Sequence, residues 1–138
     1  MTKTGFAYMG TNYTIEIDSR TGIRKVLITG KITKEQYLTI HQELRELNNL
    51  PKSVMIIEDT RLADIDFHPS EITEIKRHLQ LSSNKFEMLR IASITDNPRN
   101  TVFSTLLSQN MNSQNYQHEV FSTEEFALKW LKNESDNS

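Results

Sequence analysis

Residues 13–29 read YTIEIDSRTGIRKVLIT, and this segment predicts the β-hairpin on which our interpretation of the whole chain rests. Its first part, YTIEID, alternates apolar and polar residues, which is the two-residue period of a strand with one face in water. The SRTG that follows is typical of a tight turn, because Gly22 can adopt a positive φ angle. IRKVLIT then predicts a second strand with a continuous apolar centre. Because the link is so short, the two strands should pair antiparallel.

Helices and strands alternate after this hairpin. Gly30 is expected to end the second strand, and Thr33 with Gln36 forms a capping box that starts a helix, which Pro51 stops. The later elements are expected as a strand over 53–60, a connector over 61–67, a helix from Pro69, a strand over 89–95, a helix from Pro98, a strand over 118–121 and a helix capped by Ser122 with Glu125. Strands joined through helices should be parallel. The chain is therefore predicted to be a single α/β domain with a mixed, mostly parallel sheet of about five strands, in the order β-β-α-β-α-β-α-β-α.

The domain is expected to span residues 12–132, with flexible ends at 1–11 and 133–138, which carry no sustained apolar period. Helical spacing predicts the core faces of the last two helices. These faces are Val102, Phe103, Leu106 and Leu107, and then Phe126, Ala127, Trp130 and Leu131. An exposed Trp130 would instead indicate a homodimer face.

The composition excludes several classes of protein. The 138 residues include no cysteine, which removes disulfides, thiolate catalysis and cysteine-bound zinc and suits a reducing cytosol. The formal net charge of −2 gives no overall attraction to a phosphate backbone, so no nucleic-acid partner is expected. The first ten residues lack the pattern of a signal peptide, and no stretch approaches the roughly 20 apolar residues of a membrane helix. We therefore expect a cytoplasmic protein without an integral membrane segment.

Two segments carry a resemblance to a known family. One is a strand followed by Asp-Asn-Pro, RIASITDNP at 90–98, and the other is the ending VFSTEEFALKWL at 120–131. With the order of elements, they make most of residues 13–131 resemble the STAS and SpoIIAA-like proteins, which include the anti-sigma-factor antagonists. The resemblance implies their α/β fold and a regulatory, protein-binding role. In true antagonists an Asp-Ser-Ser/Thr-Gly turn with a phosphorylated serine follows the third strand. That place reads DFHP at 66–69 here, so this switch is not carried over.

A binding rim is expected at the carboxyl ends of the parallel strands, where ligands gather in open sheets and helix N-termini also point. Three such ends are predicted, after 53–60, after 89–95 and at Ser122-Thr123. The rim residues predicted to bind a partner or ligand are Asp59, Thr60, Arg61, Asp66, His68, Ser70, Asp96, Asn97 and Arg99. Ser70 is also a candidate for phosphorylation, because added negative charge is favourable at a helix start.

Catalytic and metal sites have weaker support. Glu58, Asp59, Asp64, Asp66 and Asp96 could together supply oxygen ligands for Mg²⁺ or Ca²⁺, but acidic residues are also common at strand ends and in first helical turns. The histidines at 41, 68, 78 and 118 show no zinc-ligand spacing. The sequence also has no serine-nucleophile elbow and no glycine-rich phosphate loop. We therefore expect no catalytic residues, no metal and no cofactor.

Three functions remain open. The first is a non-enzymatic regulatory or protein-interaction module that binds a protein partner through the rim. The second is a small-ligand domain for a lipid or an anion, although a lipid carrier needs an apolar cavity of several hundred Å³. The third is a metal-dependent hydrolase built on the acidic residues of the rim.

Overall fold

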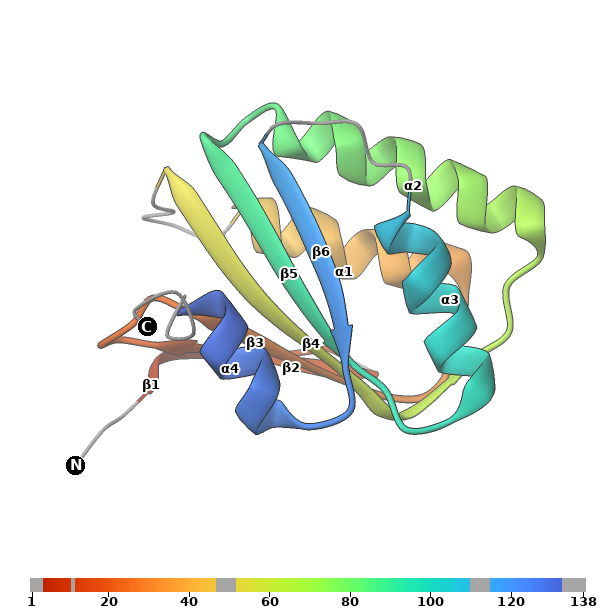
Figure 1. Cartoon of the computed structure of the whole chain (residues 1–138), viewed down its shortest axis with the longest axis horizontal. Coiled ribbons are helices and arrows are strands. Elements are labelled where there is room, and N and C mark those ends of the chain that lie inside the picture. The colour runs from red at the N-terminus through yellow and green to blue at the C-terminus, as the bar shows by residue number, and fades with distance from the viewer. Residues whose placement is uncertain (1–3, 11, 47–51, 110–114, 133–138) are drawn as a thin grey trace.

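The computed structural model describes residues 4–10, 12–46, 52–109 and 115–132. Its elements, drawn in Figure 1, are the strands β1 (Thr4–Met9), β2 (Tyr13–Asp18), β3 (Arg24–Ile32), β4 (Ser53–Ile65), β5 (Met88–Ile94) and β6 (Tyr116–Phe121), and the helices α1 (Lys34–Glu46), α2 (Pro69–Ser83), α3 (Pro98–Ser108) and α4 (Glu124–Leu131). The strands form one sheet in the sequential order β1-β2-β3-β4-β5-β6. The pairs β1–β2 and β2–β3 are antiparallel, and the three pairs from β3 to β6 are parallel. The predicted hairpin and mixed, mostly parallel sheet are confirmed.

The sheet has one strand more than the sequence indicated. The prediction that residues 1–11 form a flexible end is wrong for Thr4–Met9, which form β1 and pair with β2 in a register that places Tyr8 opposite Ile15. This segment lacks the alternation of a strand, and pairing with the backbone of β2 supplies the order instead. Residues 1–3, 11 and 133–138 of the predicted ends lie outside the described residues.

β3 and β4 are both longer than predicted. Gly30 does not end β3 but lies within it at φ 72°, a backbone conformation that suits glycine. β4 continues to Ile65, so the predicted connector over 61–67 is wrong for its first five residues. The extension follows a β-bulge, because Leu27 pairs with Asp59 whereas Thr29 pairs with Leu62. Two residues of β4 therefore lie opposite one residue of β3, and the pairing resumes beyond them.

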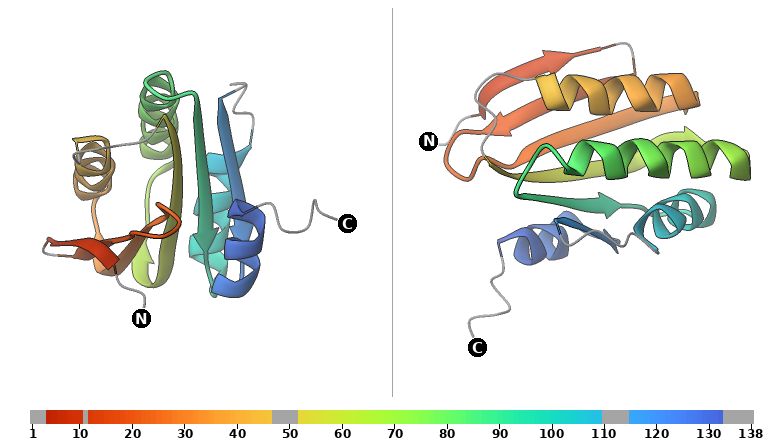
Figure 2. Two further views of the ribbon diagram at one scale, coloured as in Figure 1. Left: turned by 90° about the vertical axis from the view of Figure 1, so that its left-hand side faces the viewer. Right: turned by 90° about the horizontal axis from the view of Figure 1, so that it is seen from above.

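Helices cover both faces of the sheet. Figure 2, in its left view, shows α1 and α2 on one side and α4 on the other. The larger core joins α1, α2 and α3 to the first of these faces through residues such as Tyr37, Ile75 and Phe103. The smaller core joins α4 to the other face through Ala127 and Leu131. Among the helices that the structure describes, none combines the length and apolar character needed to span a bilayer.

The capping box of Thr33 and Gln36 is confirmed by reciprocal bonds of 3.1 and 2.8 Å between backbone and side chain. The predicted stop of α1 before Pro51 lies outside the described residues. The Ser122–Glu125 capping box is wrong, because α4 is capped by Thr123, whose side chain accepts a hydrogen bond from the Phe126 backbone.

The predicted core faces of the last two helices are too wide. Phe103, Leu107, Ala127 and Leu131 are buried as predicted, whereas Val102, Leu106 and Phe126 are exposed. Each helix contacts the sheet along a narrow stripe, so apolar residues beside that stripe remain in solvent. Trp130 is half-buried, and the Arg90 guanidinium lies 4.3 Å from the centre of its ring.

Candidate functional site

The predicted rim forms where β4 and β5 end and α2 and α3 begin. Its residues fall into two groups. The first group forms hydrogen bonds that stabilise the local backbone and consists of Asp59, Thr60, Arg61 and Asn97. The second group is exposed and consists of Asp66, His68, Ser70, Asp96 and Arg99. The exposed group is the part of the rim that faces solvent.

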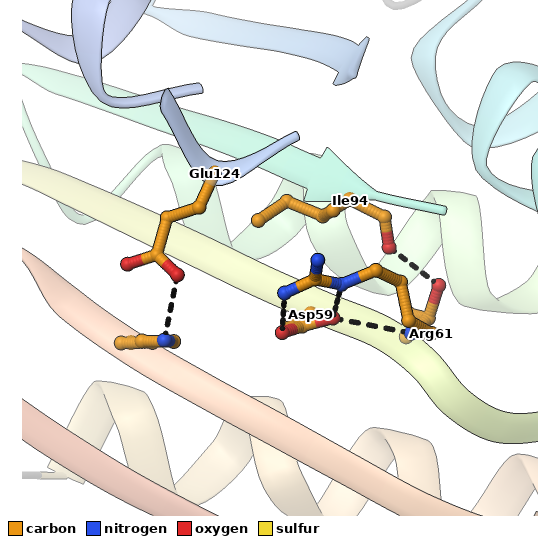
Figure 3. Close-up of polar contacts among 6 residues, drawn as sticks. Asp59, Arg61, Ile94 and Glu124 are labelled. Atoms are coloured by element: carbon orange, nitrogen blue, oxygen red, sulfur yellow. Dashed lines mark hydrogen bonds and ion pairs between the residues drawn. The ribbon is translucent and has the colours of Figure 1, made fainter. Parts of the chain in front are cut away.

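Asp59 and Arg61 form a brace across the bulge of β4 (Figure 3). The Asp59 carboxylate accepts hydrogen bonds from Nε, Nη2 and the backbone N–H of Arg61 at 2.9, 2.8 and 3.1 Å. Burial alone would raise the pKa of the Asp59 carboxyl, but these bonds outweigh burial and keep the pKa below its ordinary value. On the same face, Lys25 and Glu124 form an ion pair of 2.8 Å between β3 and the start of α4. Asp59 and Arg61 therefore stabilise an irregular strand end.

The start of α3 is anchored to the bulge by a residue that sequence reasoning missed. The buried side chain of Asn100 donates from Nδ2 to the carbonyl oxygens of Thr60 and Ala63 at 2.8 and 3.0 Å. Thr60 in turn donates from Oγ1 to the carbonyl oxygen of Ile94, at 2.9 Å. Asn97 caps α3, and its Oδ1 accepts from the Asn100 backbone N–H at 2.9 Å. An asparagine in the first turn of a helix carries no sequence signal for such a bond.

His68 and Ser70 lie together at the start of α2. His68 is the N-cap, with Nδ1 accepting from the Ser70 backbone N–H at 3.3 Å and lying 3.0 Å from Ser70 Oγ. Glu71 completes a capping box by accepting from the His68 backbone N–H at 2.8 Å. Both side chains are exposed, so His68 combines an ordinary capping role with access to solvent. No described hydrogen bond or ion pair joins this pair to the other predicted rim residues.

The exposed surface around the start of α3 contains an ion pair and apolar groups. Arg99 of α3 binds Asp64 of β4 at 2.9 Å. Two open hollows flank this helix start, one lined by Asp66, Phe67 and Arg99 and the other by residues 95–98 and 120–122. Val102 lines both hollows. We call this surface the α3 rim and define it by Leu62, Asp64, Asp66, Asp96, Arg99 and Val102.

The acidic residues of the rim do not converge. Glu58 and Asp59 are consecutive in β4, so their side chains point to opposite faces of the sheet. Asp64 is already paired with Arg99. Within the described ranges, no three histidine, aspartate or glutamate side chains are arranged to hold a metal ion.

Glu58 instead belongs to a buried polar network under α1. It is 1% exposed and accepts hydrogen bonds at Oε2 from the Tyr37 hydroxyl at 2.7 Å and from His41 Nε2 at 3.0 Å. Ser93 Oγ lies 3.4 Å from Oε1 and 2.8 Å from His118 Nε2. Burial would raise the pKa of the Glu58 carboxyl, but the bonds from His41 and Tyr37 outweigh it, so the pKa lies below its ordinary value.

The hydrogen bonds of this network form a chain directed at Glu58. An ionised Glu58 can only accept, so Ser93 donates to it and accepts from Nε2–H of His118. His118 Nδ1 then accepts from the Tyr116 hydroxyl, at 2.9 Å. Burial lowers the pKa of His118 to about 4, which keeps the imidazole neutral, as this arrangement requires. The sequence prediction considered His41 and His118 only as zinc ligands. Two signals for this network were present, because His41 follows Tyr37 by one helical turn and Glu58 interrupts an apolar strand.

Comparisons with known proteins agree with this architecture. No family model and no curated protein matches the chain. A solved structure from Shewanella loihica PV-4 is similar to it, and that structure is described as an uncharacterised protein of the DUF3478 family with a SpoIIAA-like fold. The two chains are 19% identical, the match covers 90% of this chain and 99% of the other, and the TM-score is 0.57. The chain therefore has the SpoIIAA-like fold that the resemblance in its sequence predicted.

Proposed function

We propose that this protein is a non-enzymatic regulatory module that binds a protein partner through the α3 rim. The observation that carries the proposal is the exposure of two apolar side chains at the strand ends, where Leu62 is 65% and Val102 is 57% exposed. Single exposed apolar residues are common on protein surfaces. These two belong to one surface, because one ion pair, together with strand and helix spacing, connects them.

The connection runs through the Asp64–Arg99 ion pair. Leu62 and Asp64 point to the same side of β4, because they are two residues apart in a strand. Arg99 and Val102 are three residues apart in α3 and so share one face of that helix. The ion pair between Asp64 and Arg99 therefore lies between the two apolar groups. Apolar side chains that lie close to charged groups are a usual feature of protein interfaces, and this surface has both.

The backbone under this surface is held in place before any partner binds. Asn100 ties α3 to β4, Arg61 braces the bulge, and Thr60 links β4 to β5. A surface that is already ordered loses less conformational entropy on binding. This rigidity supports the proposal that the α3 rim binds a partner.

Ser70 provides a means of regulation within this proposal. Its hydroxyl is exposed in the first turn of α2, where a phosphate would be favoured by the helix N-terminus. Phosphorylation would add negative charge close to Asp66 in the sequence and change which partners the rim accepts. The modification of Ser70 stays a prediction that mass spectrometry of the purified protein can check.

The test compares two substitutions of equal exposure. Val102→Asp places a charge at the centre of the α3 rim, and Leu81→Asp places one on α2, where Leu81 is 56% exposed and outside the rim. Tagged wild type and both variants would be purified from the source organism under one condition. We expect a partner that is retained by wild type and Leu81→Asp and lost with Val102→Asp. Equal retention by all three proteins, with both variants folded, would contradict the proposal.

A further inference from the structure

A narrow apolar slot lies between α1 and α2, at the opposite end of the sheet from the α3 rim. Its walls include Leu44 of α1 and Leu79 of α2, together with Phe86. Its base is formed by the starts of β4 and β5, including Val54, which pairs with Leu89. The slot holds about 10 Å³, which is room for about one water-sized group. We call it the α1–α2 slot.

One ring nitrogen of a buried histidine is available to this slot. His41 lines the slot, and its Nε2 forms a hydrogen bond of 3.0 Å with Oε2 of Glu58. Among the residues that the structure describes, Nδ1 of His41 has no hydrogen-bond partner, yet it is not one of the fully enclosed unsatisfied atoms. The hydrogen bond to Glu58 therefore fixes the orientation of the His41 ring and leaves Nδ1 available to a group that enters the slot. Buried polar atoms are normally paired, so Nδ1 is open to a hydrogen bond with a water or with a ligand group in the slot.

A cation lies one helical turn away. Arg45 lines the slot and follows His41 by four residues, so the two side chains share one face of α1. Its Nη1 donates to Ser82 Oγ at 2.6 Å. Within the described part of the chain, no carboxylate lies within ion-pair distance of this guanidinium. Ser82 Oγ also donates to the His78 carbonyl oxygen, so it can keep a partner if Arg45 turns away.

We propose that the α1–α2 slot binds a small organic acid with a slender apolar body. The carboxyl group lies between His41 Nδ1 and the Arg45 guanidinium, and the apolar body lies along Leu44, Leu79 and Phe86. Nε2–H of His41 points to Glu58, so binding of the carboxylate takes up one proton from solvent, and this proton lies between Nδ1 and a ligand oxygen. Arg45 is suited to a carboxylate, since its fork of donors matches the two oxygens.

Entry requires α1 and α2 to move apart, because the slot has room for about one water-sized group and is smaller than such a ligand. Polar side chains join the two helices through the Arg45–Ser82 hydrogen bond and through an ion pair of 2.9 Å between Lys34 and Glu74. The ligand carboxylate replaces the first of these contacts with a stronger one, in which donor and acceptor are both charged. Binding at this site does not depend on the α3 rim, so either proposal can fail without the other.

The test is an NMR titration of the full-length protein with sodium acetate, butanoate and hexanoate. We expect hexanoate to shift the methyl signals of Leu79 and Leu89 but not those of Val102, with a dissociation constant on the order of 1 mM, as suits a ligand of few atoms. Hexanol, which lacks the carboxylate, should bind at least about tenfold more weakly. Affinity should rise along the series as the apolar body lengthens.

Three variants separate the site from general anion attraction. Arg45→Gln should weaken hexanoate binding about tenfold, whereas Arg77→Gln, which removes an exposed arginine on α2, should leave it unchanged. Ser82→Ala frees Arg45 and should bind as well as wild type or better. Thermal unfolding of each variant checks that it is folded. The proposal is overturned if hexanoate leaves Leu79 and Leu89 unshifted, if Arg45→Gln binds like wild type, or if inorganic phosphate causes the same shifts.

Discussion

The substitution Glu58→Leu tests the buried network most directly. It removes the one acceptor that the Tyr37 hydroxyl and His41 Nε2–H share. It also removes the carboxylate that accepts the hydrogen bond from the Ser93 hydroxyl. Each buried donor left without a partner costs about 1–3 kcal/mol. With the two strong bonds at 2.7 and 3.0 Å and one weaker contact at 3.4 Å, we expect a loss of about 3–5 kcal/mol in the free energy of unfolding.

A loss of that size is a large share of the roughly 5–15 kcal/mol that stabilises an ordinary domain. Urea unfolding, followed by the fluorescence of Trp130 and by circular dichroism, measures it. Glu119→Leu is the matched control, because Glu119 is an exposed glutamate on β6 and its replacement should change stability by about 0.5 kcal/mol or less.

A double-mutant cycle gives the result that would refute this reasoning. In the wild type, Tyr37→Phe removes a hydrogen bond and should destabilise the protein. In the Glu58→Leu background the same change removes an unpaired buried hydroxyl, so it should restore part of the lost stability. If Tyr37→Phe has the same effect in both backgrounds, or if Glu58→Leu costs less than about 1 kcal/mol, Glu58 does not organise the donors around it.

Two further predictions concern acid and the anchor of α3. Burial lowers the pKa of His118 from 6.5 to about 4. Between these pH values the folded protein therefore binds fewer protons than the unfolded chain. The contribution of His118 to stability is complete above pH 6.5 and is lost as the pH falls. The loss in the free energy of unfolding should reach about 2 kcal/mol at about pH 5, and Glu58 adds to it in stronger acid. Urea unfolding of His118→Gln should show a stability that depends less on pH than that of the wild type. An unchanged dependence would exclude His118 as the cause. Asn100→Ala leaves the carbonyl oxygens of Thr60 and Ala63 without their donor and should cost about 2–3 kcal/mol, whereas Asn97→Ala removes an N-cap and should cost about 1 kcal/mol. Chemical denaturation of both variants checks this order, and a cost for Asn100→Ala no greater than that for Asn97→Ala would show that the bulge does not depend on its anchor.

The periodic parts of the fold could be predicted from the sequence. Alternation in YTIEID predicted β2, and the capping box of Thr33 and Gln36 predicted the start of α1. Pro69 and Pro98 predicted the starts of α2 and α3, because proline suits the first turn of a helix. These features involve neighbours within a few residues along the chain, so the local sequence carries their whole physical cause.

Part of the candidate site could be predicted in the same way. The rule that functional residues collect at the carboxyl ends of parallel strands located Asp66, Asp96 and Arg99 on an exposed rim. It could not separate them from Asp59 and Asn97, which lie at the same strand ends but stabilise the backbone. That difference depends on which side chains face each other across the bulge.

Contacts between distant segments required the tertiary structure. β1 has no strand pattern and is ordered by pairing with β2, and the exposure of Val102 depends on how α3 lies against the sheet. Glu58 and Asp59 are adjacent in the sequence, yet one meets Tyr37 and His41 under α1 and the other meets Arg61 on the opposite face. Period and capping are local properties of a chain, whereas burial and hydrogen-bond partners are set by residues that only folding brings together.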